Sequence, residues 1–499
     1  MTSLGFLVSF FNLFFPVLLF ASWAEDRLQE MTLEQKIGQL LVVPACPKRG
    51  EDHKADWRKL LQHFHVGHVM IKQSDPLTQV QFLNGLQKES ALGLWVLADA
   101  EWGLAMRMTG TLSFPKHMTL GAVQNIHLIE KLGFEIGRQA KLVGVHMNLA
   151  PVADVNSNPN NPVIGMRSFG VDPAEVVLRV VAFTRGLESS GIRACVKHFP
   201  GHGDTDRDSH RDLPVISHSM DRFQRVEWIP FQKAIESGAS AVMSAHLYVP
   251  TIDDVYPSSL SPKCLNVLRQ ELGFQGLIVS DALNMKALTH YSPERVAVLA
   301  RQAGSDLLLY GAHMDIAVDE IIHEIVPRAY LALKNAYTSG ELSLEALDAT
   351  VLKILKGKEG LQRELDVREL ACLHSQEAID LKQELYQQAV TLIGEEEFSL
   401  PQDSTYLSFG EGEDLLSKEF GTGKSIVIGV HGKLTEADLC SIELFKDRAI
   451  LCLFVSPYEL QHFQGFKTIL LAYENDPCAQ QAVLNILMGH KKAVGKIPI

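Results

Sequence analysis

Short apolar runs alternate with amphipathic stretches over most of the chain. Windows with helical periodicity lie between most of the runs, at residues 128–143, 173–189, 220–237, 263–272 and 293–303. Strands alternating with helices are typical of a parallel sheet, and eight such units predict a (β/α)8 barrel of the TIM type. A doubly wound sheet, the alternative, needs fewer strands and a glycine-rich phosphate turn after the first. The runs are 38–43, 66–71, 94–98, 147–153, 192–196, 239–244, 276–280 and 306–310.

A second, smaller unit follows the predicted barrel. Helical sequence continues to residue 389, and buried strands are then expected at 389–393, 425–430, 449–454 and 468–472. We therefore predict a catalytic barrel over residues 25–370 and a three-layer α/β domain over residues 390–499. Residues 421–425 read GTGKS, the end of a phosphate loop, but Lys418 stands where that motif needs glycine, so we predict a turn before a strand.

The N-terminus carries an apolar segment at residues 5–20, followed by the small residues Ser22 and Ala24. This pattern predicts a signal peptide or membrane anchor over residues 1–24. Pro16 and the lack of Lys or Arg before the apolar core leave a buried N-terminal helix as the alternative. An export signal would make the protein exported or envelope-associated, whereas a buried helix would leave it cytoplasmic.

Composition narrows the classes of function. Hydrophobic residues make up 46% and charged residues 21% of the chain, as in an ordinary globular protein, and the formal net charge is −13. With no run of Lys or Arg, the acidic balance argues against nucleic acid as a partner. The seven cysteines form no CxxC pair, which argues against a zinc framework or a disulfide scaffold.

Polar residues follow five successive apolar runs, the third to the seventh. Asp99, Asp154, Lys197, His246 and Asp281 stand just past these runs. Any strand can end in a polar residue, but barrel enzymes place their active sites at the carboxyl ends of the strands. The sequence therefore predicts a polar site at that end of the barrel.

The segment KHFPGHGDTDRDSHRDLP, residues 197–214, is a long loop dense in His and Asp. A metal site is one interpretation, with His198, His202, Asp204 and His210 as ligands, but Pro200 and Gly201 disfavour a shared helix face. The alternative is an acid/base pair, because residues two apart in an extended loop face the same way. Asp208 would then orient the imidazole of His210.

Asp281 directly follows the seventh run, in GLIVSDALNMKAL. A carboxylate at the rim of a barrel is partly desolvated yet reachable, which suits a nucleophile. The alternative is that Asp281 caps a helix over residues 284–288.

These motifs resemble glycoside hydrolase family 3, and within it the β-N-acetylglucosaminidases of the NagZ type. The resemblance covers residues 30–365, and the C-terminal region resembles the second α/β domain that some members carry. The matching segments, in order, are DAEWGLAMR (99–107), FPKHMTLGA (114–122), NLAPVADVNSNPNNPVIGMRSFG (148–170), KHFPGHGDTDRDSH (197–210), AVMSAHLYVP (241–250) and SDALNMKAL (280–288).

The resemblance implies a retaining glycoside hydrolase without metal or cofactor that removes terminal β-linked N-acetylglucosamine, from peptidoglycan-derived fragments or muropeptides. Asp281 would be the nucleophile, and His210 paired with Asp208 the acid/base. Trp102 stands where many members carry glycine, which would alter the rim of the sugar pocket. The implied sugar-binding residues are Asp99, Arg107, Arg167, Lys197 and His198.

Several alternatives remain within this interpretation. A histidine acid is neutral after it donates its proton and repels an anion less than a carboxylate does, so phosphorolysis could replace hydrolysis. A β-glucosidase is a second alternative, although such members usually lack the DSH loop. A non-catalytic sugar-binding protein would have lost a catalytic residue, yet Asp208, His210 and Asp281 are all present. We expect a monomer or a homodimer.

Overall fold

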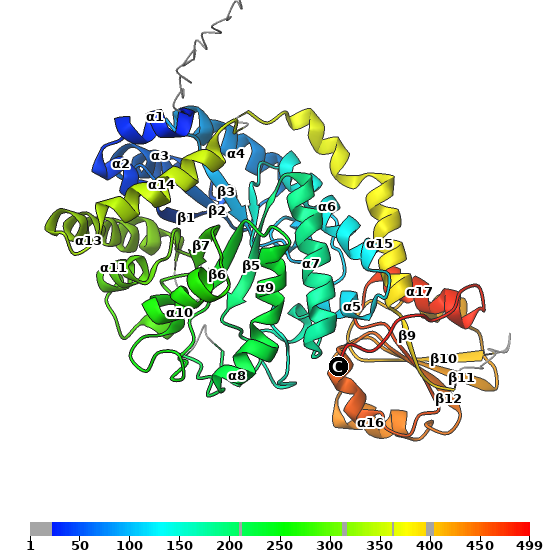
Figure 1. Ribbon diagram of the computed structural model, residues 1–499. Coiled ribbons are helices and arrows are strands. Elements are labelled where there is room, and N and C mark those ends of the chain that lie inside the picture. The colour runs from blue at the N-terminus through cyan, green and yellow to red at the C-terminus, as the bar shows by residue number, and fades with distance from the viewer. Residues whose placement is uncertain (1–21, 209–211, 312–316, 362–363, 396–403) are drawn as a thin grey trace, which may run out of the picture.

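A computed structural model describes residues 22–208, 212–311, 317–361, 364–395 and 404–499. Its larger domain is an eight-stranded parallel sheet in the order β7-β6-β5-β4-β3-β2-β1-β8. A parallel bridge between Val279 and Leu307 joins the two edges, so the sheet closes into the predicted TIM-type barrel (Figure 1). The strands are β1 (Leu41–Ala45), β2 (His68–Ile71), β3 (Trp95–Ala98), β4 (Met147–Asn148), β5 (Arg193–Phe199), β6 (Ala241–Ser244), β7 (Leu277–Ser280) and β8 (Leu308–Leu309).

Helices surround the barrel and cover its strands (Figure 1). The strands are buried on both faces and therefore read as continuous apolar runs, which is why all eight were predictable. The helices are α2 (Leu33–Gly38), α3 (Glu51–Phe64), α4 (Pro76–Glu89), α5 (His117–Ala122), α6 (Ile126–Leu142), α7 (Pro173–Ser190), α8 (Met220–Arg222), α9 (Ile229–Glu236), α10 (Pro262–Asn266), α11 (Pro293–Ala303), α12 (Val318–Glu320), α13 (Val326–Ser339) and α14 (Leu344–Lys358).

All eight strands differ from their predicted bounds by at least one residue, and the differences in β4 and β5 affect the site. β4 is shorter, because the chain after Asn148 leaves the sheet. β5 is longer and continues through Phe199 with a shift of register after Val196, so Lys197 and His198 belong to the strand instead of following it. A lysine can lie on a buried strand when a carboxylate pairs with its ammonium group, and Asp99 pairs with Lys197 in this way.

The second domain contains a five-stranded sheet in the order β10-β11-β12-β13-β9, with β9 antiparallel to β13. Figure 1 shows α16 on one side of this sheet and α15 and α17 on the other. GTGKS forms the turn that leads into β11, as predicted. The elements are α15 (Gln376–Ala389), β9 (Thr391–Gly394), β10 (Ser404–Phe409), β11 (Ser425–Val430), α16 (Glu436–Glu443), β12 (Ala449–Leu453), β13 (Thr468–Leu471) and α17 (Pro477–Leu487).

β10 was not predicted from the sequence. It lies at the edge of the sheet, and its residues STYLSF are mostly half-buried. An edge strand needs no continuous apolar run, since only one of its neighbours is another strand. Its hydrophobic pattern is therefore weak.

The two domains contact one another at several places. α15 packs against α5 and α6 of the barrel. The Glu474 carboxylate accepts hydrogen bonds from Lys116 N at 2.8 Å and from Thr119 Oγ1 at 2.5 Å. The final residues return to the barrel, where Lys496 N donates to Ala122 O and Val171 N donates to Pro498 O, both at 3.0 Å.

At the other end of the chain, α1 (Trp23–Glu30) packs against α14. Ser22 and Glu25 form a capping box that begins this helix, and Ala24 is buried. The predicted leader, residues 1–24, lies outside the described residues up to position 21. Within the described residues, no helix combines the length and the apolar character that crossing a membrane requires.

Candidate active site

A cavity of about 280 Å³ opens where the barrel strands end at their carboxyl termini. Residues from the ends of β2, β3, β4, β5, β6, β7 and β8 line it. All five predicted sugar-binding residues and the predicted nucleophile Asp281 lie in this one cavity, although they come from distant parts of the sequence. Its titratable lining residues are Lys72, Asp99, Glu101, Arg107, Arg167, Lys197, His198, His202 and Asp281.

Asp99, at the end of β3, forms ion pairs with two cations. Arg107 Nη2 lies 2.6 Å from Asp99 Oδ2, and Lys197 Nζ lies 3.2 Å from Asp99 Oδ1. Burial alone would raise the pKa of Asp99, but Lys197 and Arg107 outweigh it and hold the pKa well below the usual value. Arg107 Nε is buried and has no hydrogen-bond partner among the described residues, so it can still donate to a ligand.

Glu101 connects Lys197 to Arg167. The guanidinium of Arg167 binds both carboxylate oxygens, at 2.6 and 2.9 Å, and Lys197 Nζ lies 2.8 Å from Oε1. Burial would raise the pKa of Glu101, but the two cations lower it further than burial raises it. Burial alone would lower the pKa of Lys197, but the negative charges of Glu101 and Asp99 outweigh burial and raise the pKa above the usual value.

Asp154 orients His198 from inside the barrel. Its Oδ2 lies 2.7 Å from His198 Nδ1, and its Oδ1 accepts the backbone N–H of His202 at 2.7 Å. Because Nδ1 donates to Asp154, the other ring nitrogen of His198, Nε2, faces the cavity. It lies 3.4 Å from Arg167 Nη2. Asp154 thus fixes both a sugar-binding side chain and the first part of the loop that leads to Asp208.

Asp281 directly follows β7 and is half-buried. Its Oδ1 accepts the backbone N–H of Ala282 at 2.7 Å. The helix-cap alternative is wrong, because the next helical turn begins at Lys286 and its cap position is Met285. The carboxylate instead lies at the rim of the cavity.

The His- and Asp-rich loop is described up to Asp208, which is half-buried. His210 lies outside the described residues. The other three residues of the metal interpretation have separate partners: His198 binds Asp154, His202 Nδ1 lies 2.9 Å from Thr205 Oγ1, and Asp204 Oδ2 lies 3.0 Å from His218 Nε2. Burial lowers the pKa of His202 to about 4. These contacts do not converge on one point.

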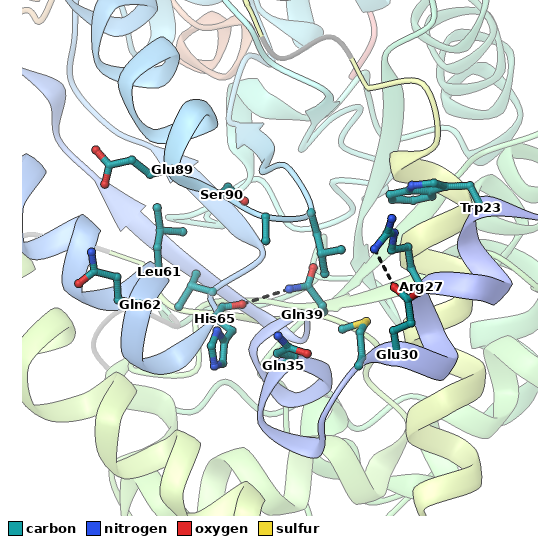
Figure 2. Close-up of a pocket in the computed structure, with 14 residues that line it drawn as sticks. Trp23, Arg27, Glu30, Gln35, Gln39, Leu61, Gln62, His65, Glu89 and Ser90 are labelled. Carbon is teal, nitrogen blue, oxygen red and sulfur yellow. Dashed lines mark hydrogen bonds and ion pairs between the residues drawn. The ribbon is translucent and has the colours of Figure 1, made fainter.

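A larger cavity, of about 560 Å³, lies at the opposite end of the barrel (Figure 2). Gln39, Val66 and Leu92 in its wall precede β1, β2 and β3, so it opens at the amino ends of the strands. Figure 2 shows Arg27 paired with Glu30, and Gln39 bound to the backbone oxygen of His65. We assign the site to the smaller cavity because the convergent charged groups lie there.

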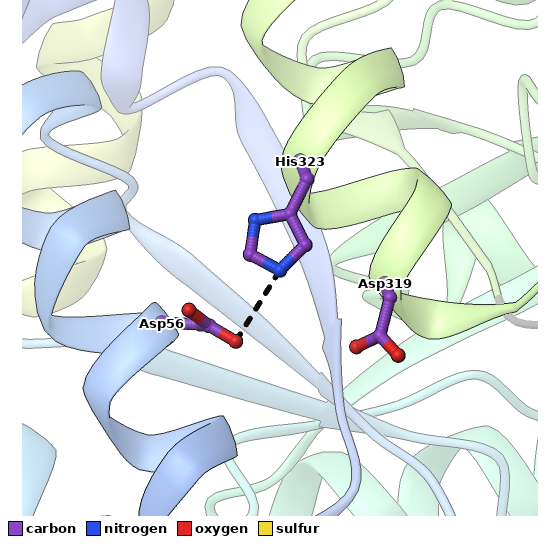
Figure 3. Close-up of side chains that lie close together, drawn as sticks. All are labelled: Asp56, Asp319 and His323. Atoms are coloured by element: carbon purple, nitrogen blue, oxygen red, sulfur yellow. Dashed lines mark ion pairs between the residues drawn. The ribbon is translucent and has the colours of Figure 1, made fainter.

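Asp56 on α3, Asp319 on α12 and His323, in the helical turn that follows α12, lie close together (Figure 3). Arg49 Nη2 lies 2.6 Å from Asp319 Oδ2, and His323 Nε2 lies 3.3 Å from Asp56 Oδ2. Asp319 and His323 are exposed. Because Arg49 already pairs with Asp319 and two of the three side chains are exposed, we assign no metal to the cluster.

Comparisons with known proteins identify the family. Residues 32–356 match the model of the glycosyl hydrolase family 3 N-terminal domain. The chain belongs to glycosyl hydrolase family 3. This confirms the resemblance, since the matched region contains every predicted site residue.

The family 3 chain has relatives with curated names. It is 30% identical over 372 residues to β-hexosaminidase A of Pseudoalteromonas piscicida. The aligned region covers 66% of this chain and 62% of that relative. The chain is 31% identical over 333 residues to β-hexosaminidase LpqI of Mycobacterium tuberculosis, covering 64% and 81%. A family 3 β-N-acetylglucosaminidase structure from Paenibacillus sp. FPU-7 aligns with a TM-score of 0.79 at 29% identity, covering 94% of this chain and 98% of that one.

Three residues that line or support this family 3 site were given no individual role from the sequence. Glu101 and Asp154 stood at the ends of predicted runs but were not assigned a role. Lys72 follows the second run directly. The signal that located Asp99 and Asp281, a polar residue immediately after an apolar run, also finds Lys72 when it is applied to every run.

Glu101→Gln tests the ion-pair network of this family 3 protein. We expect the free energy of unfolding to fall by about 3 kcal/mol at pH 7, because the half-buried Arg167 loses its charged partner and the buried Lys197 loses one of two. The pKa of Glu101 is lowered in the folded state, so its stabilising contribution is complete above the unfolded pKa, about 4.3, and is lost as pH falls through the folded value. The difference between the variant and the parent protein should therefore shrink only below about pH 4.

Urea unfolding at a series of pH values measures this difference. Glu369→Gln, an exposed residue, is the matched control and should change the stability little. A Glu101→Gln effect that stays the same from neutral to acid pH would contradict the assigned ionisation.

Proposed function

We propose that this protein is a retaining β-N-acetylglucosaminidase that removes terminal, non-reducing β-linked N-acetylglucosamine. The observation that carries the proposal is the presence of Asp281 in the same cavity as the paired groups of Asp99, Arg107 and Lys197. The guanidinium and ammonium groups can donate hydrogen bonds to the hydroxyl oxygens of a sugar, and the ionised carboxylates can accept hydrogen bonds from its hydroxyl groups. Relatives named β-hexosaminidase and a related β-N-acetylglucosaminidase structure support the sugar specificity.

The first chemical step needs a nucleophile and a proton donor. Asp281 attacks the anomeric carbon, a C–O bond to Asp281 forms, and the bond to the leaving oxygen breaks. Asp99 and Glu101 are poor donors for that oxygen, because the cations around them hold the pKa of each carboxyl well below the usual value. The proton must come from another group.

The loop that contains Asp208 and His210 supplies that group in this proposal. His210 protonates the leaving oxygen, and Asp208 orients the imidazole. In the second step His210 removes a proton from water, and the water oxygen displaces Asp281 from the anomeric carbon. The sugar is released with the original β configuration, because the carbon is inverted twice.

Hydrolysis of a panel of aryl β-glycosides by the purified protein tests this function. We expect the N-acetylglucosaminide to be cleaved with a higher kcat/KM than the glucoside or the xyloside. A glucoside preferred over the N-acetylglucosaminide would instead support a β-glucosidase. We further propose peptidoglycan-derived fragments as the natural substrate, to be compared with chitin oligosaccharides in the same assay.

Phosphorolysis is the second candidate. The cations Lys72, Arg107, Arg167 and Lys197 outnumber the carboxylates Asp99, Glu101 and Asp281 in the lining of the cavity, which favours the approach of an anion. Turnover in the presence and absence of inorganic phosphate, with detection of a sugar 1-phosphate, distinguishes the two reactions.

The apolar segment at residues 5–20 supports an envelope location for this activity. Fractionation of cells that produce the full chain, compared with a chain beginning at Ser22, tests it. Recovery of both forms in the cytoplasm would contradict the proposal.

A further inference from the structure

Lys72 is a buried cation of the cavity that the reaction described above does not use. It directly follows β2, lines the cavity and is 9% exposed. Each of the other three lining cations forms an ion pair with a carboxylate at 3.2 Å or less. Lys72 Nζ forms no hydrogen bond or ion pair with any residue in the described part of the chain.

The side chain of Lys72 is buried, but its Nζ is not among the fully enclosed polar atoms, because the residue lines the cavity. An ammonium group that burial partly removes from water is unfavourable unless hydrogen bonds replace that water. Burial accordingly lowers the pKa of Lys72, although Asp99 partly opposes this. The missing hydrogen bonds can form when a ligand enters the cavity. Lys72 thus has three N–H donors available, since none of the described residues accepts a hydrogen bond from its Nζ.

The position of Lys72 in the barrel indicates which side of a ligand it meets. The strand order places β8, β1 and β2 next to one another, opposite the groups on β4 and β5. On this side the cavity is lined by Met70, Lys72 and Leu309. Among the described residues, Lys72 is the charged group that lines this side, whereas Asp99 follows β3, Lys197 lies on β5 and Asp281 follows β7.

We propose that Lys72 is a substrate-binding residue that donates hydrogen bonds to hydroxyl oxygens of the sugar held over Asp281. This proposal rests on the proposed function, since it takes the ligand to be a pyranose. It adds a contact on the β8–β1–β2 side that the five residues identified from the sequence do not provide. Lys72 and Asp281 line the same cavity, so one sugar can contact both groups.

Lys72→Met tests the proposal, because methionine has a similar length but no charge or donor. We expect KM for an aryl β-N-acetylglucosaminide to rise and kcat/KM to fall about tenfold to a hundredfold, as for a lost hydrogen bond to a charged group. We expect Tm to be equal or higher, because an unpartnered buried charge is removed. A purely structural lysine would lower Tm and leave KM unchanged. Lys48→Met, an exposed cation nearby, is the matched control and should behave as the parent protein does.

A series of monodeoxy aryl glycosides identifies the contacted hydroxyl. Removing that hydroxyl should lower kcat/KM for the parent protein, and the same removal should have little further effect in Lys72→Met. Unchanged kinetics in Lys72→Met, or equal deoxy effects in both proteins, would overturn the proposal. If the parent protein cleaves no glycoside, the proposed function fails, and calorimetric binding of N-acetylglucosamine to the parent protein and to Lys72→Met still tests the contact.

Discussion

Asp281→Ala is expected to lower kcat by about 10⁴-fold or more, because the group that forms the covalent intermediate is removed. The fold should persist, since the side chain is half-buried and lines the cavity at the rim of the barrel, outside the hydrophobic core. Steady-state hydrolysis of an aryl β-N-acetylglucosaminide measures the loss. Thermal unfolding shows that the variant is folded.

Adding azide tests whether the lost activity reflects the loss of the nucleophile. Azide can enter the space left by the Asp281 carboxylate and attack the anomeric carbon from the same side, which gives an α-glycosyl azide from a β-glycoside. Asp172→Asn, at a helix cap outside the cavity, is the control and should keep full activity. Substantial turnover by Asp281→Ala without azide would mean that another group is the nucleophile.

His210→Ala is expected to have the second largest effect, and the effect should depend on the leaving group. For a disaccharide, whose leaving oxygen is strongly basic, kcat/KM should fall by about 10²–10⁴-fold, because general acid catalysis is lost. For an aryl glycoside with a dinitrophenolate leaving group, formation of the intermediate should be nearly as fast as in the parent protein. Stopped-flow and steady-state kinetics on both substrates measure the difference.

Two further loop variants serve as comparisons. Asp206→Ala alters an exposed carboxylate of the same loop and should leave both substrates unaffected. Asp208→Asn should show a weaker form of the His210→Ala pattern, because the imidazole stays but is less well oriented. Equal slowing of both substrates by His210→Ala would argue against a role as the acid.

The barrel and the positions of its charged residues could be predicted from the sequence for one physical reason. Parallel strands covered by helices are largely apolar, so a polar residue marks the end of most of them, and those ends meet at one side of the barrel. Asp99 and Asp281 were located in this way, and both line the same cavity.

The partners within the site could not be predicted in the same way. Glu101 and Arg167 are 66 positions apart, and no spacing rule relates a residue after β3 to one after β4. The strand that contains Lys197 also extends beyond its apolar part, because Asp99 and Glu101 compensate the lysine charge from the end of β3, two strands away. Such compensation between distant residues is a property of the folded chain and is not visible in a local pattern.

The return of the C-terminal tail to the barrel has a consequence for protein engineering. The chain passes between the domains twice, once after α14 and once through residues 495–498, which bind near Ala122 and Val171. A single proteolytic cut at Gly360 should therefore yield two fragments that remain associated, held by the tail and by the packing of α15 on α5 and α6. Produced as two separate polypeptides, the same fragments are candidates for reassembly into an active enzyme, as in split-protein complementation.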